Sequence, residues 1–331
     1  MKKSSVCEGI REFLSAKITE CKVMVIGDVM LDRYFSGEVE RISPEAPVPI
    51  NRVEKKKDTL GGAGNVAHNL ARLGCQVALA GLIAPDHHGR LLQRKLRNLG
   101  IDAEGLLDGR DETTTKIRVL GGHQQMIRLD FEERAPIAAE VSGQLLTFAE
   151  KCMDESLGAV IISDYGKGVC TEEVCQAIIE EAHRRGILVL VDPKGCDWSR
   201  YRGADYITPN VKETGEAVGH PLSNVDEALR EATKSLMEKY DLRNVMTTRS
   251  EKGLSLFGSG EEITIPTVAQ EVFDVSGAGD TVIAAFAAGL AGGLSHYEAA
   301  YMANVAAGVG VGKVGTYAVS REEIVERMRI M

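Results

Sequence analysis

The sequence predicts an α/β protein with a mostly parallel β-sheet that helices cover on both faces. Apolar segments of strand length recur along the chain, and amphipathic helical patterns lie between most of them. These segments are continuously apolar, as strands buried on both faces are. Such an order of elements is typical of a doubly wound fold, and we expect all 331 residues to form a single domain of this kind.

The expected strands follow one another along the chain as residues 22–29, 76–83, 159–165, 187–193, 205–210 and 244–249. The helical patterns between them are NVAHNLARLG (65–74), GRLLQRKLRNLG (89–100), TEEVCQAIIEEAHRRG (171–186) and NVDEALREATKSLMEKY (224–240). Ligands of such sheets bind at the carboxyl ends of the strands. Most of the residues that close these strands are polar, so we expect the functional site there: Gly27-Asp28, Asp164-Tyr165, Asp192-Pro193-Lys194, Asn210 and Thr248-Arg249.

Two segments, residues 34–57 and 113–132, break this alternation because they show a period of two with no helix between strands. In the second segment, Gly121-Gly122 predicts the turn of a hairpin. One face of this hairpin would be apolar and the other charged, with Ile117, Val119, Ile127, Leu129 and Phe131 opposite Lys116, Arg118, Arg128 and Asp130. We expect a small β lid over the strand ends; a sheet edge with a solvated face is the alternative.

Composition excludes several classes of function. The net charge of −9 and the isoelectric point of 5.4 argue against a nucleic-acid or anionic-membrane partner, because both need a basic surface. Glu8, Arg11 and Glu12 interrupt any signal-peptide pattern, and the longest uncharged stretch, 281–295, is too short to span a bilayer. We therefore expect a cytoplasmic protein. The seven cysteines include no Cys-x-x-Cys pair and the seven histidines form no ligand pattern, so neither a disulfide framework nor a zinc site is predicted.

The segment FDVSGAGDT (273–281) places a carboxylate, Asp280, between a turn of small residues and a run of helix formers. An Asp in the first turn of a helix is favoured because it complements the dipole and binds free N–H groups. The small residues Gly277, Ala278 and Gly279 also leave their backbone N–H groups open to an anion. Asp280 is therefore either a helix cap or a base beside a phosphate.

Neither of two common nucleotide-binding motifs occurs here in its usual context, so a nucleotide would have to bind through another arrangement of residues. Residues 310–315, GVGKVG, match G-x-G-x-x-G but follow a helical stretch and lead into TYAVS, which is not a helix. No phosphate-binding G-x-x-x-x-G-K-[ST] motif occurs, because Val314 follows Lys313.

Three elements in order resemble the ribokinase-type carbohydrate kinases, the PfkB family: GGAGN (61–65), NVKE (210–213) and DVSGAGD (274–280). Within that family, the sequence is most similar to the heptose 7-phosphate kinases of lipopolysaccharide precursor synthesis. RISPEAPVP (41–49) and HQQMIRLDFEE (123–133) are the most specific stretches, and GDVMLDRY (27–34), SDYGKG (163–168), VDPKG (191–195) and TTRSEKG (247–253) support them. The resemblance runs from about residue 22 to residue 320 and implies a ribokinase-like fold.

The resemblance implies roles for individual residues. Asp280 would be the catalytic base, and the amides of Gly277, Ala278 and Gly279 would form the anion hole. Asp32 would bind sugar hydroxyls together with Gly61, Gly62 and Asn65. Two alternatives remain: Asp32 could be an ordinary loop acid paired with Arg33, and residues 61–65 could be a Gly-rich start of a helix. Asn210 and Glu213 would organise Mg²⁺ through water. Lys194, Thr248, Arg249, Ser250 and Gly253 would contact ATP phosphates and ribose, Asn304 would lie near adenine, and Asp274 with Ser276 would form a site for a monovalent cation such as K⁺.

A sugar that already carries a phosphate needs a cationic pocket in this acidic protein. The candidates are Arg33, Arg41, Arg128 and Lys167, each of which has a solvated surface charge as its alternative interpretation. Gly121-Gly122 stands where many relatives would carry a basic residue, and Ser276 replaces a commoner Thr.

The predicted function is the ATP-dependent phosphorylation of D-glycero-β-D-manno-heptose 7-phosphate at O1, by a homodimer joined through its β lids. Alternatives are another kinase of this family acting on fructose 6-phosphate, a tagatose phosphate or an unphosphorylated sugar, a catalytically silent sugar- or nucleotide-binding module, and a dinucleotide-dependent reductase. Relatives often carry this kinase fused to a nucleotidyltransferase, and the chain is either a stand-alone kinase or one domain of such a fusion.

Overall fold

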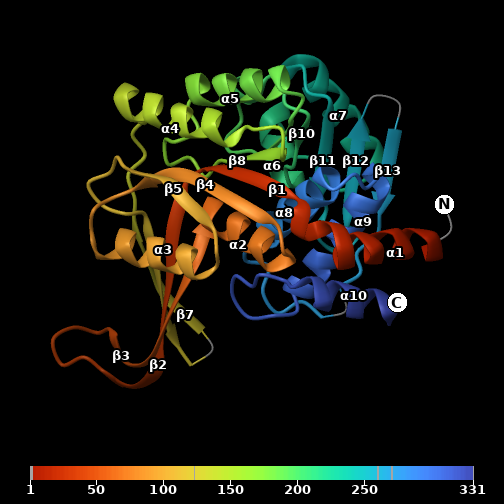
Figure 1. Ribbon diagram of the computed structural model, residues 1–331. Coiled ribbons are helices and arrows are strands. Elements are labelled where there is room, and N and C mark those ends of the chain that lie inside the picture. The colour runs from red at the N-terminus through yellow and green to blue at the C-terminus, as the bar shows by residue number, and fades with distance from the viewer. Residues whose placement is uncertain (1–2, 123, 259–260, 270, 331) are drawn as a thin grey trace.

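The computed structural model describes residues 3–122, 124–258, 261–269 and 271–330 (Figure 1). Its strands are β1 (Lys22–Gly27), β2 (Val29–Ile42), β3 (Pro49–Gly62), β4 (Gln76–Ile83), β5 (Asp102–Asp108), β6 (Thr115–Gly121), β7 (Gln124–Phe131), β8 (Leu157–Ser163), β9 (Leu188–Asp192), β10 (Tyr206–Ile207), β11 (Asn244–Thr248), β12 (Leu254–Gly258) and β13 (Glu261–Ile265). Its α-helices are α1 (Lys3–Glu12), α2 (Ala63–Leu73), α3 (His87–Asn98), α4 (Ala139–Cys152), α5 (Glu172–Arg184), α6 (Val211–Val218), α7 (Asp226–Tyr240), α8 (Ala278–Ala291), α9 (His296–Gly310) and α10 (Arg321–Arg329).

The central sheet has nine strands in the order β13-β12-β11-β10-β9-β8-β1-β4-β5. All neighbours pair in parallel except β11 with β12 and β12 with β13, which are antiparallel. The predicted mostly parallel sheet is therefore confirmed, and each of the six expected strands is present with its end shifted by two or three residues at most.

Helices cover both faces of this sheet, as the continuously apolar strands predict (Figure 1). Along β1, Val23 and Val25 pack in the core beneath α1, α2, α8 and α9, whereas Met24 and Ile26 pack in the core beneath α4, α5 and α7. Successive side chains of a strand point to opposite faces, so one apolar strand supplies both cores.

A second sheet of four strands, in the order β3-β2-β6-β7, projects from the carboxyl end of β1 (Figure 1). We call this sheet the lid; it contains the described parts of the segments 34–57 and 113–132. Directly paired residues share a face, so the register defines two faces of the lid. Asp32, Tyr34, Lys116 and Arg118 lie on one face, and Arg33, Phe35, Ile117 and Val119 lie on the other.

Within the described ranges, none of the helices has the length and apolar composition that crossing a bilayer requires.

Candidate active site

Asp280 lies in the first turn of α8, below the carboxyl ends of β1, β8 and β9. The helix starts after Gly277, whose φ of 79° lies in the left-handed region. A Cβ at this position would stand 2.8 Å from Nδ2 of Asn65. Glycine is required here because the turn is left-handed and because Asn65, at the start of α2, comes very close.

Two donors hold the Asp280 carboxylate, which is only 3% exposed. The Asn65 amide donates to Oδ2 over 2.7 Å, and the Tyr165 hydroxyl donates to Oδ1 over 2.6 Å. Burial raises the pKa of Asp280 to about 6; the charge of Asp32 acts in the same direction, while the two hydrogen bonds oppose it. A carboxylate tuned in this way can accept a proton near neutral pH.

The raised pKa predicts how activity depends on pH. Asp280 must be ionised to accept a proton, so kcat/KM should fall about tenfold per unit as pH drops below about 6, and should level off above that value. A pH profile of kcat/KM between pH 4.5 and 8, within the range in which circular dichroism is unchanged, measures this limb. A limb near pH 4, the ordinary range of an Asp, would contradict the prediction.

Asp32 lies on the lid face that turns toward Asp280 and is 5% exposed. Its carboxylate forms an ion pair with Arg118 of β6, not with Arg33. Gly61, on the paired strand β3, leaves the space that this carboxylate fills, since a Cβ there would stand 2.5 Å from Asp32 Oδ2. Gly62 has a φ of 55° and lies against the Asp28 carbonyl, so it lets the chain turn from β3 into α2.

A row of cations crosses the same face of the lid. Lys57 pairs with Tyr34, Tyr34 pairs with Arg118, and Arg118 pairs with Arg128 across β3, β2, β6 and β7. We call Lys57, Arg118 and Arg128 the cation row. Like charges directly opposite each other, as in Arg118 and Arg128, are unfavourable in a sheet. Each arginine has an acidic partner, Asp32 or Asp130, and an anion bound between the two would further relieve their repulsion. The cation row is therefore suited to a phosphate.

The other candidate cations have different places. Arg33 lies on the opposite face from Asp32 and is bound to Asp58 at 2.7 Å and His88 at 2.8 Å, which argues against the role expected for it. Arg41 is exposed near the far end of β2. Lys167 is 8% exposed and its Nζ lies 2.6 Å from Glu132 at the end of the lid. Burial opposes the charge of Glu132, but Lys167 and Arg134 outweigh it and lower the pKa of Glu132 to about 2.

Asn210 and Glu213 form a capping box at the start of α6. The Asn210 side chain accepts a hydrogen bond from the Glu213 amide at 2.9 Å, and the Glu213 carboxylate accepts one from the Asn210 amide at 3.0 Å. Lys194 lies 3.5 Å from the second oxygen of Glu213. Asp192 lies at the end of β9, where its carbonyl accepts a hydrogen bond from the Asp164 amide at 3.1 Å. Its carboxylate has no recorded hydrogen bond among the described residues, and burial, with the charges of Asp280 and Glu213 acting in the same direction, raises its pKa.

A cavity of about 420 Å³ opens on the other side of the Asp280 turn. Its walls come from the ends of β11 and β12, the start of α8, and α9, and include Thr248, Ser250, Gly253, Ala278, Gly279 and Asn304. The Asn304 amide donates to the Pro266 carbonyl at 2.7 Å. Most of the exposed lining is apolar and comes from residues such as Leu254, Val282 and Ala307. An apolar lining suits the binding of a flat ring.

Arg249 does not line this cavity, which argues against its predicted phosphate contact. Its side chain is buried, with hydrogen bonds of 2.9 Å to Asn224 and to Ser255 and an ion pair of 2.6 Å with Asp226. A buried guanidinium with these partners fixes the turn that carries Thr248 and Ser250.

Asp274 and Ser276 lie in the loop before the turn. The Asp274 carboxylate accepts hydrogen bonds of 2.9 Å from the backbone amides of Ser276 and Gly315. Burial opposes its charge, but these hydrogen bonds prevail and lower the pKa of Asp274. The carboxylate thus joins two loops beside the Asp280 turn.

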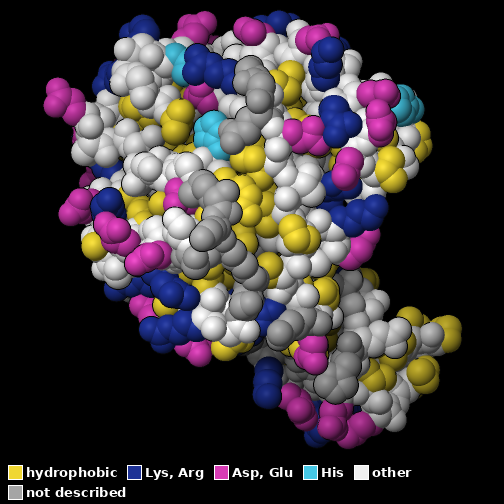
Figure 2. Space-filling view, turned by 90° about the vertical axis from the view of Figure 1, so that its right-hand side faces the viewer, with side chains coloured by type: hydrophobic (Ala, Val, Ile, Leu, Met, Phe, Trp, Pro, Cys, Tyr) yellow, Lys and Arg dark blue, Asp and Glu magenta, His cyan; other side chains and the backbone are white. Residues whose placement is uncertain are grey.

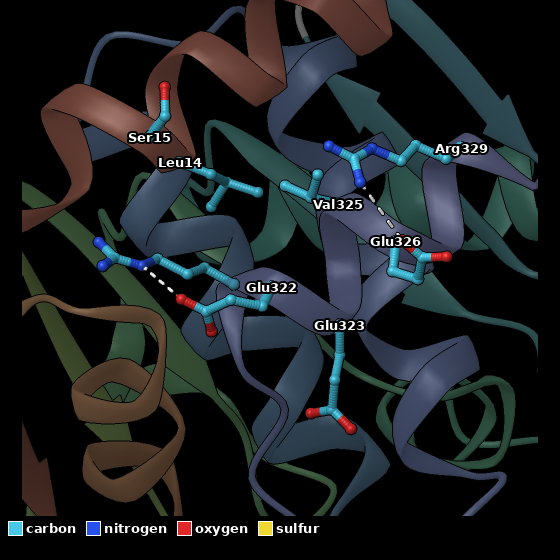
Figure 3. A pocket seen from close by; sticks show the side chains of 8 residues that line it. Leu14, Ser15, Glu322, Glu323, Val325, Glu326 and Arg329 are labelled. Atoms are coloured by element: carbon cyan, nitrogen blue, oxygen red, sulfur yellow. Dashed lines mark hydrogen bonds and ion pairs between the residues drawn. The ribbon is translucent and has the colours of Figure 1, made fainter.

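A larger cavity, of about 650 Å³, lies away from the strand ends, between the N-terminal helix and α10 (Figure 3). Charged side chains such as Glu322 and Arg329 line it and pair with neighbours on α10 itself. No set of three or more His, Cys, Asp or Glu side chains in the described part of the chain could hold a metal ion.

Three residues of this site, Tyr165, Arg118 and Lys57, are not singled out by the sequence motifs, and Lys57 enters only as the end of the segment 34–57. Tyr165 was seen only as part of a polar strand end, and Arg118 only as part of a charged hairpin face. The alternation that places Lys116, Arg118 and Arg128 on one face of β6 and β7 was the available signal. Nothing in the sequence indicated that Tyr165 reaches Asp280. His123, in one of the specific stretches, lies outside the described residues.

Comparison with known proteins identifies the family of the chain. Residues 21–323 match the family described as pfkB family carbohydrate kinase. A protein of Syntrophotalea carbinolica named "Bifunctional protein HldE" is 48% identical over 322 residues, which cover 96% of this chain and 65% of the relative. A protein of the same name from Shewanella sediminis is 46% identical, over 94% of this chain and 64% of the relative. The chain thus spans somewhat less than two thirds of the length of these curated relatives.

Solved structures show the same fold. Ribokinase of Arabidopsis thaliana, complexed with ribose and ATP, superposes with a TM-score of 0.74 at 20% identity, covering 93% of this chain and 99% of that one. Phosphofructokinase-2 of Escherichia coli, in complex with potassium, superposes with a TM-score of 0.79 at 19% identity, covering 94% and 98%. The fold is ribokinase-like, as predicted, and the chain belongs to the pfkB family of carbohydrate kinases.

Proposed function

We propose that this chain transfers the γ-phosphoryl group of ATP to O1 of D-glycero-β-D-manno-heptose 7-phosphate, giving the 1,7-bisphosphate and ADP in lipopolysaccharide core precursor synthesis. One observation carries the proposal most directly. The buried base Asp280 stands between a ring-sized cavity lined by its own turn and a lid face that presents Asp32 and the cation row. Two substrates bound on these two sides would meet at Asp280.

The side chains divide the chemistry between them. Asp280 accepts the proton of the sugar O1 hydroxyl as O1 attacks the γ-phosphorus, and ADP departs on the opposite side. The backbone amides of residues 277–279 stabilise the charge on the transferred group. Asp32 accepts hydrogen bonds from sugar hydroxyls, and Thr248, Ser250 and Asn304 lie where nucleotide ribose and base would bind.

The residues also fit a magnesium ion and ATP. Magnesium prefers oxygen ligands and retains several waters, which suits a single carboxylate such as that of Glu213. When bound there through water, the ion would add positive charge beside the phosphates. The role of Glu213 is to hold that water shell while its capping box keeps the carboxylate in place.

A phosphorylated sugar is favoured over a neutral one by the cation row. Lys57, Arg118 and Arg128 gather positive charge on the Asp32 face of an acidic protein. The stretches RISPEAPVP and HQQMIRLDFEE, and the relatives that are 46–48% identical, support heptose 7-phosphate over fructose 6-phosphate or a tagatose phosphate.

A panel of sugars tests the proposal. ADP release is measured with Mg-ATP and, in parallel, heptose 7-phosphate, fructose 6-phosphate and ribose. Selective turnover of the heptose phosphate is the expected result. Equal turnover of all three would contradict the substrate, and binding of ATP or sugar without turnover would favour the silent binding module instead.

The cation row makes a prediction of its own. Arg128→Met should raise KM for heptose 7-phosphate about 10- to 100-fold, since it removes one charge-assisted contact, and should leave KM for ATP unchanged. Arg128 is a suitable target because its side chain is 48% exposed and, among the described residues, its recorded bonds are to Asp130, two residues away. Arg52→Met, at a side chain that is 64% exposed and is bound to three glutamates of the lid, is the matched control. Equal effects of the two variants would contradict this role of the row.

We also propose that two copies associate through their lids. Large apolar side chains are 39–61% exposed there, and hydrophobic side chains are visible on the part of the molecule that projects below the main body (Figure 2): Val39, Ile42, Val48, Val53, Ile127, Leu129 and Phe131. Light scattering at micromolar concentration should give a dimer for the wild type and a monomer for Ile127→Glu/Leu129→Glu. A monomeric wild type would contradict the proposal.

Two further features belong to the proposal. A potassium ion beside Asp274 and Ser276 should make turnover faster in KCl than in choline chloride of equal ionic strength, and equal rates would contradict it.

The reaction would take place in the cytoplasm, where ATP is supplied, and fractionation of cells that express the chain would test this.

A further inference from the structure

The carboxylate of Asp280 is held from two directions by groups of different elements. Asn65 approaches Oδ2 from α2, and Tyr165 approaches Oδ1 from the loop after β8. A carboxylate bonded at one oxygen can turn about its Cβ–Cγ bond, whereas donors on both oxygens fix its plane. We propose that Tyr165 is a positioning residue of the phosphoryl transfer: its hydroxyl fixes the orientation in which Asp280 receives the proton of the sugar hydroxyl. This inference rests on the proposed function of Asp280.

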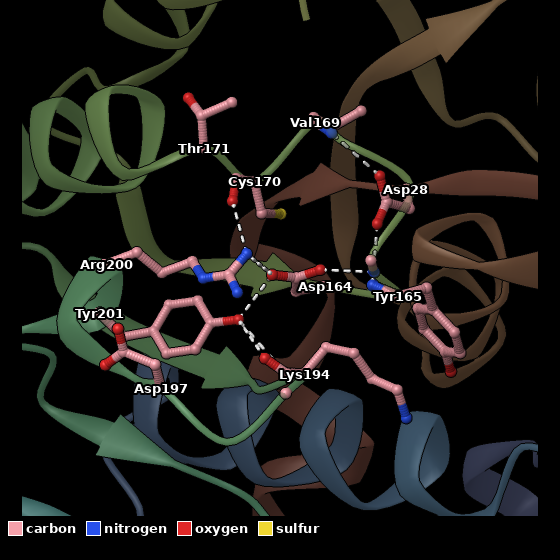
Figure 4. A network of polar contacts seen from close by, with 12 residues as sticks. Asp28, Asp164, Tyr165, Val169, Cys170, Thr171, Lys194, Asp197, Arg200 and Tyr201 are labelled. Carbon is pink, nitrogen blue, oxygen red and sulfur yellow. Dashed lines mark hydrogen bonds and ion pairs between the residues drawn. The ribbon is translucent and has the colours of Figure 1, made fainter. Parts of the chain in front are cut away.

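The loop that carries Tyr165 is unusually well anchored (Figure 4). Asp28, buried at the end of β1, accepts hydrogen bonds from the backbone amides of Tyr165 at 2.8 Å, Lys167 at 2.9 Å and Val169 at 3.2 Å. Asp164 accepts from the Gly166 amide at 2.7 Å. A loop whose backbone is held at four amides fixes the position of the Tyr165 hydroxyl. A donor with a fixed position can in turn hold the base, Asp280, in one orientation.

The hydroxyl of Tyr165 has no other partner among the described residues, and its burial beside Asp280 and Asp192 raises its pKa well above the ordinary value. It therefore stays protonated and acts as a donor at every pH at which the enzyme works. The charges that face Asp280 are Asp32 from the lid and Asp192 from β9, both acidic, so the two neutral donors are what favours its ionised form. The proton from the sugar passes to Asp280, and the phenol keeps its own.

Tyr201 offers a matched control. Its hydroxyl donates to Asp164 over 2.6 Å, the same length as the bond from Tyr165 to Asp280. Both tyrosines belong to the network in Figure 4; the Tyr201 hydroxyl also accepts a hydrogen bond from the Lys194 amide at 3.2 Å, but among the described residues it has no recorded contact with Asp280. Tyr→Phe at either position removes one hydroxyl from one carboxylate, that of Asp280 or that of Asp164, and Tyr201→Phe also removes the acceptor of the Lys194 amide.

The experiment combines titration with kinetics. Carboxyl ¹³C NMR of the free protein, with Asp280→Asn to assign the signal, measures the titration of Asp280 without any sugar. In Tyr165→Phe this titration should move upward by about one pH unit, as loss of one hydrogen bond to a charged group predicts. The same variant should lose about 10- to 100-fold in kcat at the plateau of its pH profile, with KM for ATP unchanged. Tyr201→Phe should lower the melting temperature and leave the Asp280 titration in place.

Unchanged titration and unchanged plateau kcat in Tyr165→Phe would overturn the inference, and so would equal shifts in both variants. If Tyr165→Phe fails to fold, fluorotyrosine placed at position 165 keeps the ring and strengthens the donor, so the titration should move downward; no movement would again overturn the inference. A wild type that turns over no sugar would refute the proposed function, while the NMR titration would still decide the contact between Tyr165 and Asp280.

Discussion

Asp280→Asn should lower kcat about 10²–10⁴-fold, the usual contribution of a general base, and leave ATP binding intact. Asn has nearly the shape of Asp but no basic oxygen pair, so the proton of the sugar hydroxyl has no acceptor. The amide would also place a donor against either Asn65 or Tyr165, both of which are donors to Asp280. Rates of ADP formation with saturating ATP and sugar phosphate measure the loss, and fluorescence of a labelled ATP analogue measures nucleotide affinity.

The matched control for this variant is Asp205→Asn. Asp205 is also buried, at 2% exposed, but its carboxylate is bound by Arg243 at 2.6 Å, His183 at 3.2 Å and the Val189 amide at 2.8 Å, none of which belongs to α8 or bonds Asp280. This variant should lower the free energy of unfolding by about 1–3 kcal/mol and leave kcat unchanged. A kcat for Asp280→Asn within tenfold of the wild type would show that another group takes the proton.

The central sheet could be predicted from the sequence because its signal is local. A strand such as β8 is apolar at every position from Ala159 to Ile162, which is typical of strands covered on both faces, and Ile161 and Ile162 do lie in the two separate cores. The order of the nine strands could not be read in the same way. Strand order depends on crossovers between distant segments, and no residue spacing records it.

The candidate site was predictable where a motif and a backbone requirement coincide, as at Gly277 and Asp280. It was less predictable where a side chain has two possible partners. Pairing of Asp32 with its neighbour Arg33 is an alternative that the sequence leaves open, but adjacent residues of a strand point to opposite faces, and Asp32 binds Arg118 from β6. Arg249 shows the converse: its place after a strand suggests a ligand contact, whereas Asn224, from a loop before α7, turns the guanidinium into the core.

Gly277→Ala should reduce kcat about 100-fold and lower the free energy of unfolding by about 1–2 kcal/mol. The cost to stability arises because a residue with a Cβ is strained at the φ of 79° found here. The cost to activity arises because the new Cβ would stand 2.8 Å from the Asn65 amide, and Asn65 can yield only by moving away from Asp280. Thermal unfolding and steady-state kinetics measure the two effects separately.

Gly279→Ala, two residues further along the same turn, is the matched control. Gly279 lies inside α8, and a Cβ there would meet no other atom within 4 Å. Alanine in a helix is more stable than glycine by about 0.5–1 kcal/mol, so this variant should unfold at a higher temperature than the wild type. Gly279 lines the cavity proposed for ATP, so nucleotide affinity is compared in both variants to separate effects on binding from effects on the base. Equal loss of stability in the two variants would contradict the argument from backbone geometry, and a Gly277→Ala enzyme with full kcat would show that Asn65 does not control the position of Asp280.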